Sequence, residues 1–306
     1  MKLILLALVS TVALAFDVHA KVSELVTAVE SESDYRYTHA EGSRLVKHSF
    51  NSFCGDLLEL WSSSYAKEPE LRNFIFVSDF EDKRQKTFGY VGYDPKERDV
   101  VVVFRGSENL QNWFNNLDTV KTDWERSRGR VHKGFLRGYS ESLQEQLWHL
   151  VETTARRFKA RAVTFTGHSL GGALAQLSAV DIGQDLPDSM MTRVITFGSP
   201  RVGDPIFRNQ DIPGVVDSIF RVVHRRDSVP GLPLRSFGFR HGAQEVWYHN
   251  KRDPSEYRLC RDSDDEDKNC SRGGIQTSLD QHLMYLGIQA GQCTGDIQSA
   301  VADATT

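Results

Sequence analysis

The chain has 306 residues, of which 40% are hydrophobic, 25% charged and 10% aromatic, and it carries a formal net charge of -4. These proportions are those of an ordinary globular protein, so they exclude collagen-like, coiled-coil and wholly disordered chains. The mild acidity argues against a nucleic-acid-binding protein, which usually presents a basic face. The length suits one large α/β domain or two small ones, and in either case the core needs no metal to hold it together.

Residues 1–20 have the pattern of a secretory signal peptide. Lys2 supplies the positive charge, residues 3–16 are apolar, and small residues precede two candidate cleavage sites, after Ala15 and after Ala20. The apolar run of about 14 residues is shorter than the roughly 20 that a transmembrane helix needs. We therefore expect a secreted, extracellular protein without a stable transmembrane anchor.

The remaining chain is expected to form one domain. We expect a single catalytic domain over residues 21–306 with its core over about 45–295, because no low-complexity linker or internal repeat divides it. The polar stretch from Lys21 to about Lys47 is either a pro-segment or an N-terminal arm.

Four cysteines, an even number in an exported chain, predict disulfides and allow three pairings. Cys260 and Cys270 bracket a short acidic loop, and Cys54 would then join Cys293 near the other end of the chain. The four cysteines lack zinc-ligand spacing, and the acidic loop lacks the glycine and glutamate of a calcium-binding EF-hand. We expect no metal.

Short β-branched runs alternate with amphipathic segments along the chain. The run 100–104 is continuous and apolar, as in a parallel strand that is buried on both faces. Further strands are predicted at 73–77, 162–166, 193–197 and 219–223, and helices at 140–159 and about 172–182. This alternation predicts an α/β sandwich around a mostly parallel sheet.

The motif Gly167-x-Ser169-x-Gly171 lies between a predicted strand and a predicted helix. That context is typical of a nucleophile elbow, in which a sharp turn raises the serine hydroxyl above the sheet. The helix N-terminus that follows can stabilise a developing anion, and the amide of Leu170 is the natural first donor. Ser169 is therefore the candidate nucleophile.

A serine nucleophile needs a base and an orienting acid, which follow it in the order acid, then histidine in this fold. Asp227 follows the strand 219–223 in a turn-rich loop and is the preferred acid over Asp204 and Asp217. The histidines after Ser169 are His224, His241, His249 and His282. His282 lies late in the chain, where a loop can reach back over the elbow, but spacing alone leaves the base open.

Two further features follow the strand 100–104. Ser107 stands at its carboxyl end, where it can supply a second oxyanion contact. The next residues form a short amphipathic helix with Leu110, Trp113, Phe114 and Leu117 on one face. An ordinary core helix would show the same pattern, but the aromatic face directly after the oxyanion strand favours a lid that opens on a lipid surface.

Taken together, these stretches resemble the lipase class 3 family, the secreted filamentous-fungal type of triacylglycerol lipase with the α/β-hydrolase fold. The resemblance is carried, in order, by residues 103–107, 112–113, 131–135, 167–171, 197–203, 227–233 and 282–287. Residues 251–274, with the acidic loop, fall outside these motifs, and Met284 stands where an aromatic residue is common.

The resemblance implies Ser169 as nucleophile, Asp227 as orienting acid and His282 as base. It implies an oxyanion hole at Ser107 and Leu170 and a lid over 110–117. It also supports the pairing of Cys54 with Cys293.

We therefore expect a serine carboxylic-ester hydrolase, most simply a triacylglycerol lipase, that works by acyl transfer without any cofactor. Its partner would be an ester lipid at a lipid–water interface, not nucleic acid, and the protein would be a monomer. A phospholipase A1 or a feruloyl-type esterase would share this machinery. A serine peptidase would have little use for the lid, and an inactive lipid-binding protein would not need the serine, acid and base.

Overall fold

The computed structural model describes residues 35–107, 109, 110, 112, 117–261, 266–273 and 278–294. The expected signal peptide and the lid residues Trp113 and Phe114 lie outside this part of the chain. The chain divides between Tyr37 and Thr38, and the account below concerns the unit that begins at Thr38.

An eight-stranded mixed sheet forms the centre of this unit, in the strand order β1-β2-β3-β6-β7-β8-β9-β10. Strands β3, β6, β7, β8 and β9 run parallel to one another, whereas β1, β2 and β10 join antiparallel at the two edges. The bounds are β1 Ile75–Asp82, β2 Thr87–Asp94, β3 Asp99–Phe104, β6 Ala162–His168, β7 Met191–Phe197, β8 Ser218–His224, β9 Gln244–Tyr248 and β10 Arg258–Leu259. The carboxyl ends of five parallel strands therefore meet at one edge, where open α/β sheets place their sites.

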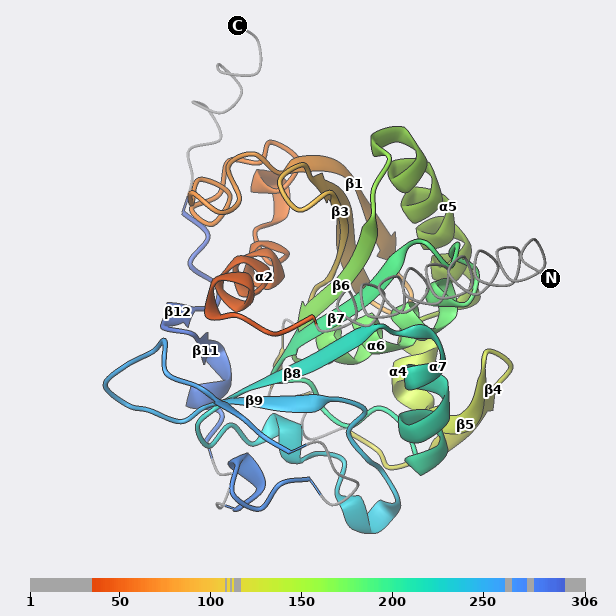
Figure 1. The fold of residues 1–306 in the computed structure, drawn as a ribbon, viewed down its shortest axis with the longest axis vertical. Helices are drawn as coiled ribbons and strands as arrows, with labels where there is room; N and C mark the ends of the chain where they lie inside the picture. Colours follow the sequence, from red (N-terminus) through yellow and green to blue (C-terminus); the bar gives the residue numbers. More distant parts are fainter. Residues whose placement is uncertain are drawn as a thin grey trace, which may run out of the picture. The chain divides into compact units, whose positions relative to one another are not determined.

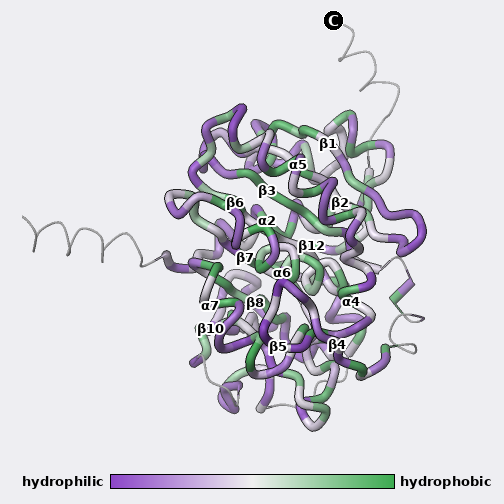
Figure 2. The backbone as a smooth tube through the Cα atoms, turned by 90° about the vertical axis from the view of Figure 1, so that its right-hand side faces the viewer, coloured by the Kyte–Doolittle hydropathy of each residue, from purple (hydrophilic) through white to green (hydrophobic). Residues whose placement is uncertain are grey.

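The central strands are buried on both faces, which explains their continuous apolar sequences. Every residue of β3 and of β6 is buried, and β3 is visible in Figure 2 as a hydrophobic stretch between β2 and β6. The predicted strands at 73–77, 100–104, 162–166, 193–197 and 219–223 correspond to β1, β3, β6, β7 and β8. The predicted α/β sandwich around a mostly parallel sheet is confirmed.

Helices cover both faces of the sheet (Figure 1). α2 (His39–Asn51) lies on one face, and α5 (Glu141–Phe158) and α6 (Leu170–Gly183) lie on the other. α5 begins where the side chain of Ser140 accepts a hydrogen bond from the amide of Leu143, as an N-cap residue does. Both predicted helices are present, and α6 starts two residues earlier than expected, directly after Ser169.

Shorter elements complete the unit. β4 and β5 form a hairpin, α4 follows it, and β11 pairs with β12 after the last 3-10 turn. Their bounds are β4 Lys121–Trp124, β5 Ser127–His132, α4 Lys133–Gly138, α7 Ile212–Val215, β11 Met284–Tyr285 and β12 Ile288–Gln289, with 3-10 turns at Gly55–Leu57, Val229–Gly231, Arg235–Phe237, Ser271–Gly273 and Asp280–Leu283 and a π turn at Phe207–Asp211. Among the described helices, none combines the length and the hydrophobicity that crossing a bilayer requires.

Candidate active site

Ser169 sits on a sharp turn between β6 and α6. Its φ of 59° and ψ of -127° are unusual for a residue with a side chain, and such strain is common at functional sites. The flanking glycines make the turn possible, because a Cβ on Gly167 would lie 2.4 Å from the carbonyl carbon of Gly171, and one on Gly171 would lie 2.2 Å from the oxygen of Phe104. The elbow predicted from Gly167-x-Ser169-x-Gly171 thus has the required geometry.

Asp227 and His282 meet beside this turn although 55 residues separate them. His282 Nδ1 donates a hydrogen bond of 2.7 Å to Asp227 Oδ2, and both side chains are fully buried. The hydroxyl of Tyr285 donates to the same oxygen, and the amide of Val229 donates to Asp227 Oδ1 at 2.9 Å. The hydrogen on Nδ1 leaves Nε2 of a neutral His282 as a proton acceptor.

His282 is packed against the residue that precedes the serine. The rings of His168 and His282 have centroids 4.3 Å apart, and His168 Nε2 donates to the carbonyl oxygen of His282 at 2.7 Å. Burial lowers the pKa of His168 well below its ordinary value, so this ring is neutral. The amide of Ser169 in turn donates to the oxygen of Phe197 at 2.9 Å. These contacts fix the elbow and the ring of His282 relative to each other.

Some buried atoms at this junction have unused hydrogen-bonding capacity, and two of them belong to the candidate nucleophile and the candidate base. Neither Ser169 Oγ nor His282 Nε2 has a hydrogen-bond partner among the described residues. Buried polar atoms without partners are rare, and in the absence of substrate catalytic hydrogen bonds are often long or poorly aligned. These are the two atoms between which a serine proton would have to pass.

The end of β3 lies against the elbow, where an oxyanion hole would form. Phe104 pairs with Gly167 in the parallel register, and a Cβ on Gly106 would lie 3.3 Å from the Cβ of Ser169. Ser107 is the next residue and is half-buried, as is Leu170 at the start of α6. Ser107 thus follows a glycine whose added Cβ would reach the serine, and Leu170 follows the serine directly.

A cavity of about 290 Å³ opens beside Leu170. It is lined by residues of the lid segment, of β5 and of α4, among them Asn112, Leu117, His132 and Phe135. Leu110 is half-buried and Leu117 packs against the core. The cavity is mixed in polarity and large enough to admit part of an acyl chain or a head group.

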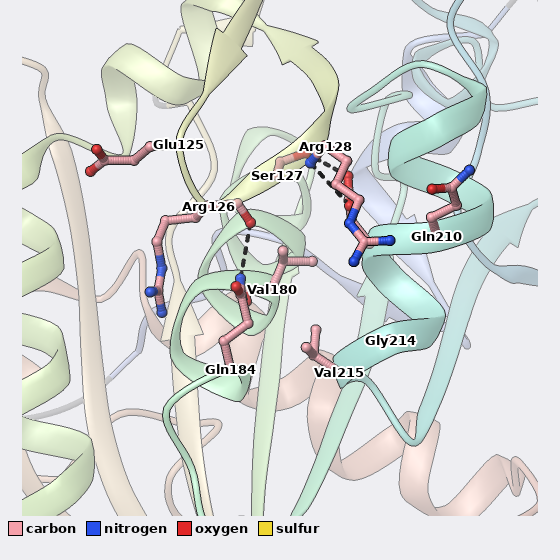
Figure 3. A pocket seen from close by; sticks show the side chains of 10 residues that line it. Glu125, Arg126, Ser127, Arg128, Val180, Gln184, Gln210, Gly214 and Val215 are labelled. Carbon is pink, nitrogen blue, oxygen red and sulfur yellow. Dashed lines mark hydrogen bonds between the residues drawn. The ribbon is translucent and has the colours of Figure 1, made fainter.

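A larger cavity, of about 400 Å³, lies elsewhere (Figure 3). It is bounded by the β4–β5 hairpin, by α7, by Val180 of α6 and by Gln184, which follows α6. The side chain of Gln184 donates to the oxygen of Arg126 at 2.9 Å. Since α6 has 14 residues and rises about 1.5 Å per residue, this cavity is roughly 15–20 Å from Ser169. Although this cavity is the larger of the two, it is too far from Ser169 to be the reaction site.

The other candidate acids and bases have different partners. Asp204 Oδ1 accepts from the amides of Ile206 and Phe207, and Asp217 Oδ2 accepts from the amide of Thr192, so both stabilise turns or strand ends. The three remaining histidines contact the Gln281 oxygen (His224), the Pro230 oxygen (His241) and the Glu256 carboxylate (His249). The structure pairs Asp227 with His282, whereas each of these other residues has a different partner.

Both disulfides join the expected pairs, Cys54 with Cys293 and Cys260 with Cys270. Glu245, Cys260 and Cys270 bring three potential metal-ligand atoms within 4.8 Å of one another. The two sulfurs are bonded to each other and Glu245 is paired with Arg221 at 2.6 Å, so this group has the chemistry of a disulfide beside an ion pair.

Sequence reasoning missed two residues that hold the candidate site together. Tyr285 is fully buried, and burial together with the Asp227 charge raises its pKa well above the ordinary value, so it stays protonated and donates. Gly198 has a φ of +62° and leaves room for the ring of His282, since a Cβ there would lie 2.7 Å from His282 Cε1. Both residues lie in stretches that carry the family resemblance, Gly198 in 197–203 and Tyr285 in 282–287, but the sequence assigned neither a role.

Known proteins share these features. A family model described as lipase (class 3) matches residues 101–237. The lipase of Rhizomucor miehei is 34% identical over 252 residues, 80% of this chain and 68% of that protein. The lipase of Rhizopus niveus is 33% identical over 225 residues, 71% of this chain but only 55% of its own length, so the chain spans about half of that relative. A solved triacylglycerol lipase whose catalytic centre is a serine protease triad has a TM-score of 0.74 and 31% identity, over 83% of this chain and 96% of that chain.

A parallel sheet that carries a strained serine between strand and helix, beside a buried Asp–His pair, defines an α/β-hydrolase. The chain belongs to the lipase class 3 family and is accordingly a carboxylic ester hydrolase.

Proposed function

We propose that this protein is a secreted triacylglycerol lipase in which Ser169 is the nucleophile, His282 the general base and Asp227 the orienting acid. The observation that carries the proposal is the buried hydrogen bond of 2.7 Å from His282 Nδ1 to Asp227, while Nε2, next to the elbow, has no partner in the described part of the chain. An orienting carboxylate of this kind fixes the tautomer of the base and stabilises the imidazolium that forms.

The reaction has two steps. His282 Nε2 takes the proton of Ser169 Oγ as that oxygen bonds to the ester carbonyl carbon, and the same proton then passes to the alcohol, which leaves as its bond to carbon breaks. In the second step His282 takes a proton from water as the water oxygen bonds to the acyl carbon. The bond between that carbon and Ser169 Oγ then breaks, and the proton passes from His282 to Oγ. Acid and alcohol are the products, and no cofactor takes part.

Ser107 and the amide of Leu170 would stabilise the oxyanion of both intermediates. The positive end of α6, which begins at Leu170, adds to this stabilisation because backbone amides at a helix N-terminus have no partners within the helix. Removal of one oxyanion donor usually costs about 3–4 kcal/mol, or a hundred- to thousand-fold in rate.

The substrate is proposed to be an ester lipid at a lipid–water interface. The lid segment 110–117, with Trp113 and Phe114 on its apolar face, would turn outward on such a surface and uncover the cavity beside Leu170. On this proposal Trp113→Ala lowers activity on emulsions more than on soluble esters.

The remaining proposals concern the mature protein. Residues 1–20 would be removed as a signal peptide, and residues 21–306 would act as a single catalytic domain and as a monomer. Two disulfides, together with relatives described as secreted lipases, support an extracellular location.

The decisive experiment measures acid release from a short-chain triglyceride as its concentration crosses the solubility limit, for the mature protein and for Ser169→Ala. We expect a jump in rate at the limit that is absent in the variant. A smooth saturation curve would contradict action at an interface and favour small or cell-wall esters. Hydrolysis that survives Ser169→Ala would show that another residue is the nucleophile, and phospholipids as the only substrates would indicate a phospholipase A1.

A further inference from the structure

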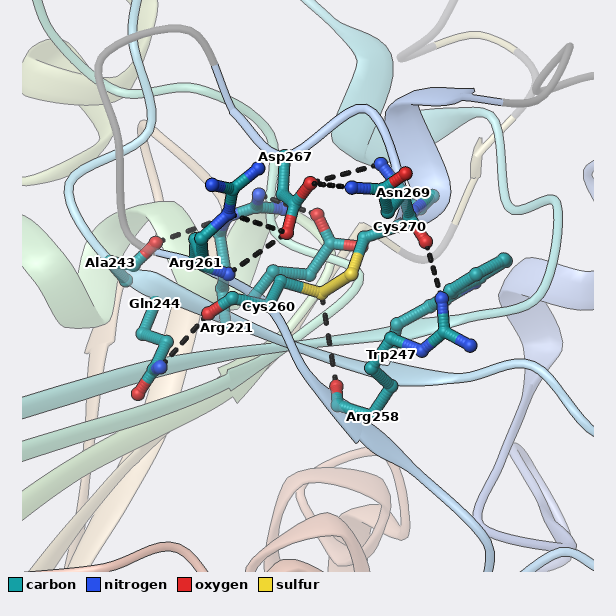
Figure 4. Close-up of a disulfide and its surroundings, with 12 residues drawn as sticks. Arg221, Ala243, Gln244, Trp247, Arg258, Cys260, Arg261, Asp267, Asn269 and Cys270 are labelled. Carbon is teal, nitrogen blue, oxygen red and sulfur yellow. Dashed lines mark hydrogen bonds and ion pairs between the residues drawn. A yellow bond between two sulfur atoms is a disulfide. The ribbon is translucent and has the colours of Figure 1, made fainter.

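A disulfide hairpin lies beside β9 and β10, outside the motifs of the family. Cys260 and Cys270 close it, ten residues apart (Figure 4). The carboxylate of Asp267 binds backbone amides on both sides of the disulfide loop. Its Oδ2 accepts from the amide of Arg261 at 3.1 Å, and its Oδ1 accepts from the amide of Asn269 at 2.9 Å. The residue before Asp267 is therefore held in a defined place.

That residue, Glu266, has a buried carboxylate. It is 7% exposed and forms a two-pronged ion pair with Arg201, which is 5% exposed. The bonds run from Nε to Oε1 at 2.8 Å and from Nη2 to Oε2 at 2.7 Å. Burial would raise the pKa of Glu266, but the hydrogen bonds from Arg201 and the nearby positive charges hold it well below its usual range. The pair is fully charged.

The remaining donors of Arg201 form hydrogen bonds with the loop that follows Asp227, the candidate acid. Its Nη1 donates to the oxygens of Gly231 at 2.5 Å and Pro233 at 2.9 Å. Its backbone amide donates to the oxygen of Leu232 at 2.7 Å. One arginine thus satisfies three successive carbonyl groups, and Glu266 is the counter-charge that fixes the orientation of its planar fork.

This loop is continuous with Asp227. The amide of Val229, two residues before the first of these carbonyl groups, donates to Asp227 Oδ1 at 2.9 Å. A displacement of residues 229–233 would therefore move the donor that orients the carboxylate, and the carboxylate orients His282. The contacts form one path from the hairpin to the base.

We propose that Glu266 is a positioning residue for ester hydrolysis: by holding Arg201 in place, it fixes the loop that bears Asp227 and so the direction of the His282 ring. This inference rests on the proposed function of Asp227 and His282.

A buried ion pair could instead serve stability alone, and the chain offers a matched control for that role. Glu245 and Arg221 form a second buried pair, 2.6 Å long, beside the same disulfide. Glu245 is 2% exposed and Arg221 is 5% exposed. Arg221 also donates to the oxygen of Ala243 at 3.3 Å, which lies outside the loop 227–233. Glu245→Gln therefore removes a similar buried charge without loosening that loop.

The test compares the mature wild type, Glu266→Gln and Glu245→Gln. Active sites are counted by the nitrophenolate released stoichiometrically with diethyl p-nitrophenyl phosphate, and kcat and KM are measured per titrated site on soluble p-nitrophenyl butyrate across pH. We expect Glu266→Gln to lose about 10- to 100-fold in kcat, with KM changed less than about twofold and the acid limb of the pH profile displaced. We expect Glu245→Gln to melt at a lower temperature but to keep kcat within about twofold.

A normal kcat and pH profile for Glu266→Gln, or an equal loss of kcat in Glu245→Gln, would overturn the positioning role. If Glu266→Gln does not fold, Glu266→Asp keeps the charge but withdraws it by one methylene, and an unchanged kcat per site in that variant overturns the proposal equally. A wild type that is not titrated, or is titrated equally in Ser169→Ala, would refute the proposed nucleophile instead, so the two failures are distinguishable.

Discussion

The hydroxyl of Tyr285 donates to the same carboxylate oxygen of Asp227 that accepts the hydrogen bond from His282. Two donors on one oxygen fix the plane of the carboxylate. On the proposed mechanism, this balance sets both the direction of the base and its affinity for a proton.

Tyr285→Phe removes one of these donors without changing the packing of the ring. A hydrogen bond to a buried charge contributes about 1.5–3 kcal/mol, so we expect a lower melting temperature and a loss of kcat of about tenfold or less. Because Asp227 would keep more of its negative charge for His282, the apparent pKa of the base in the kcat/KM profile is expected to rise. Thermal unfolding and pH–rate profiles measure both effects, and a variant unchanged in both would contradict this role of Tyr285.

Gly198→Ala is expected to abolish most of the activity because the new Cβ would lie 2.7 Å from both His282 Cε1 and the hydroxyl oxygen of Tyr285. Displacement of a catalytic ring by about 1 Å can cost about a hundredfold in rate. Gly291→Ala is the matched control, since Gly291 also has a positive φ, +78°, but a Cβ added there would meet no atom of the described residues within 4 Å. Both variants should lose about 1–2 kcal/mol of stability from backbone strain, and only Gly198→Ala should lose kcat on a soluble ester.

The stability of the protein should depend on pH through Asp99, which lies at the amino end of β3, away from the candidate site at the carboxyl ends of the parallel strands. Asp99 is fully buried at the start of β3, and burial raises its pKa from 3.8 to about 6, although Arg44 lies 3.9 Å away and opposes the shift. A raised pKa means that the folded state binds this proton more tightly than the unfolded state. The stability it gives is therefore complete below about pH 4 and is lost as the pH rises through about 6.

Asp99→Asn should remove this dependence. The free energy of unfolding of the variant relative to the wild type is expected to rise between pH 4 and pH 7, by about 3 kcal/mol at most. Urea unfolding at several pH values across this window measures the difference. A difference that does not change with pH would contradict the raised pKa of Asp99.

Two exposed apolar side chains after the acid loop are expected to contact the lipid surface. Leu234 and Phe237 are 51% and 50% exposed, and the Lys121 amine donates to the oxygen of Phe237 and so holds this turn in place. Replacing both with serine should lower the rate on an emulsion several-fold and leave the rate on a soluble ester unchanged. Ile75→Ser is the control, because Ile75 is 40% exposed but lies on the edge strand β1. Equal losses on emulsion from both changes would refute a specific contact.

The fold class could be predicted because buried parallel strands have continuous apolar sequences, as in residues 100–104. α2 could not be, because its buried residues include Arg44, Lys47 and His48, whose ion pairs and hydrogen bonds replace the usual apolar stripe. The strand β2 was also not predicted, since its glycines break the apolar pattern; one of them, Gly89, would bring a Cβ within 2.2 Å of the Val103 oxygen.

The candidate site divides in the same way. The elbow is local, so its glycine spacing is visible in the sequence. The pairing of Asp227 with His282 and the link from Glu266 to Arg201 join residues 55 and 65 positions apart, and no spacing rule relates such residues. For Asp227 and His282 the family resemblance supplied what the spacing did not. The link between Glu266 and Arg201 became visible only in the structure.

The bond between Cys54 and Cys293 spans 239 residues and turns almost the whole described unit into a covalent ring. Closure of so large a ring removes conformational entropy from the unfolded chain equivalent to about 5 kcal/mol. It also changes what proteolysis can do. A single cut in a loop between Cys54 and Cys293 leaves the two fragments linked by the disulfide. The cleaved protein therefore keeps its full mass until the disulfide is reduced. If the protein is secreted, as proposed, a single cleavage by an extracellular protease would therefore not separate the two fragments.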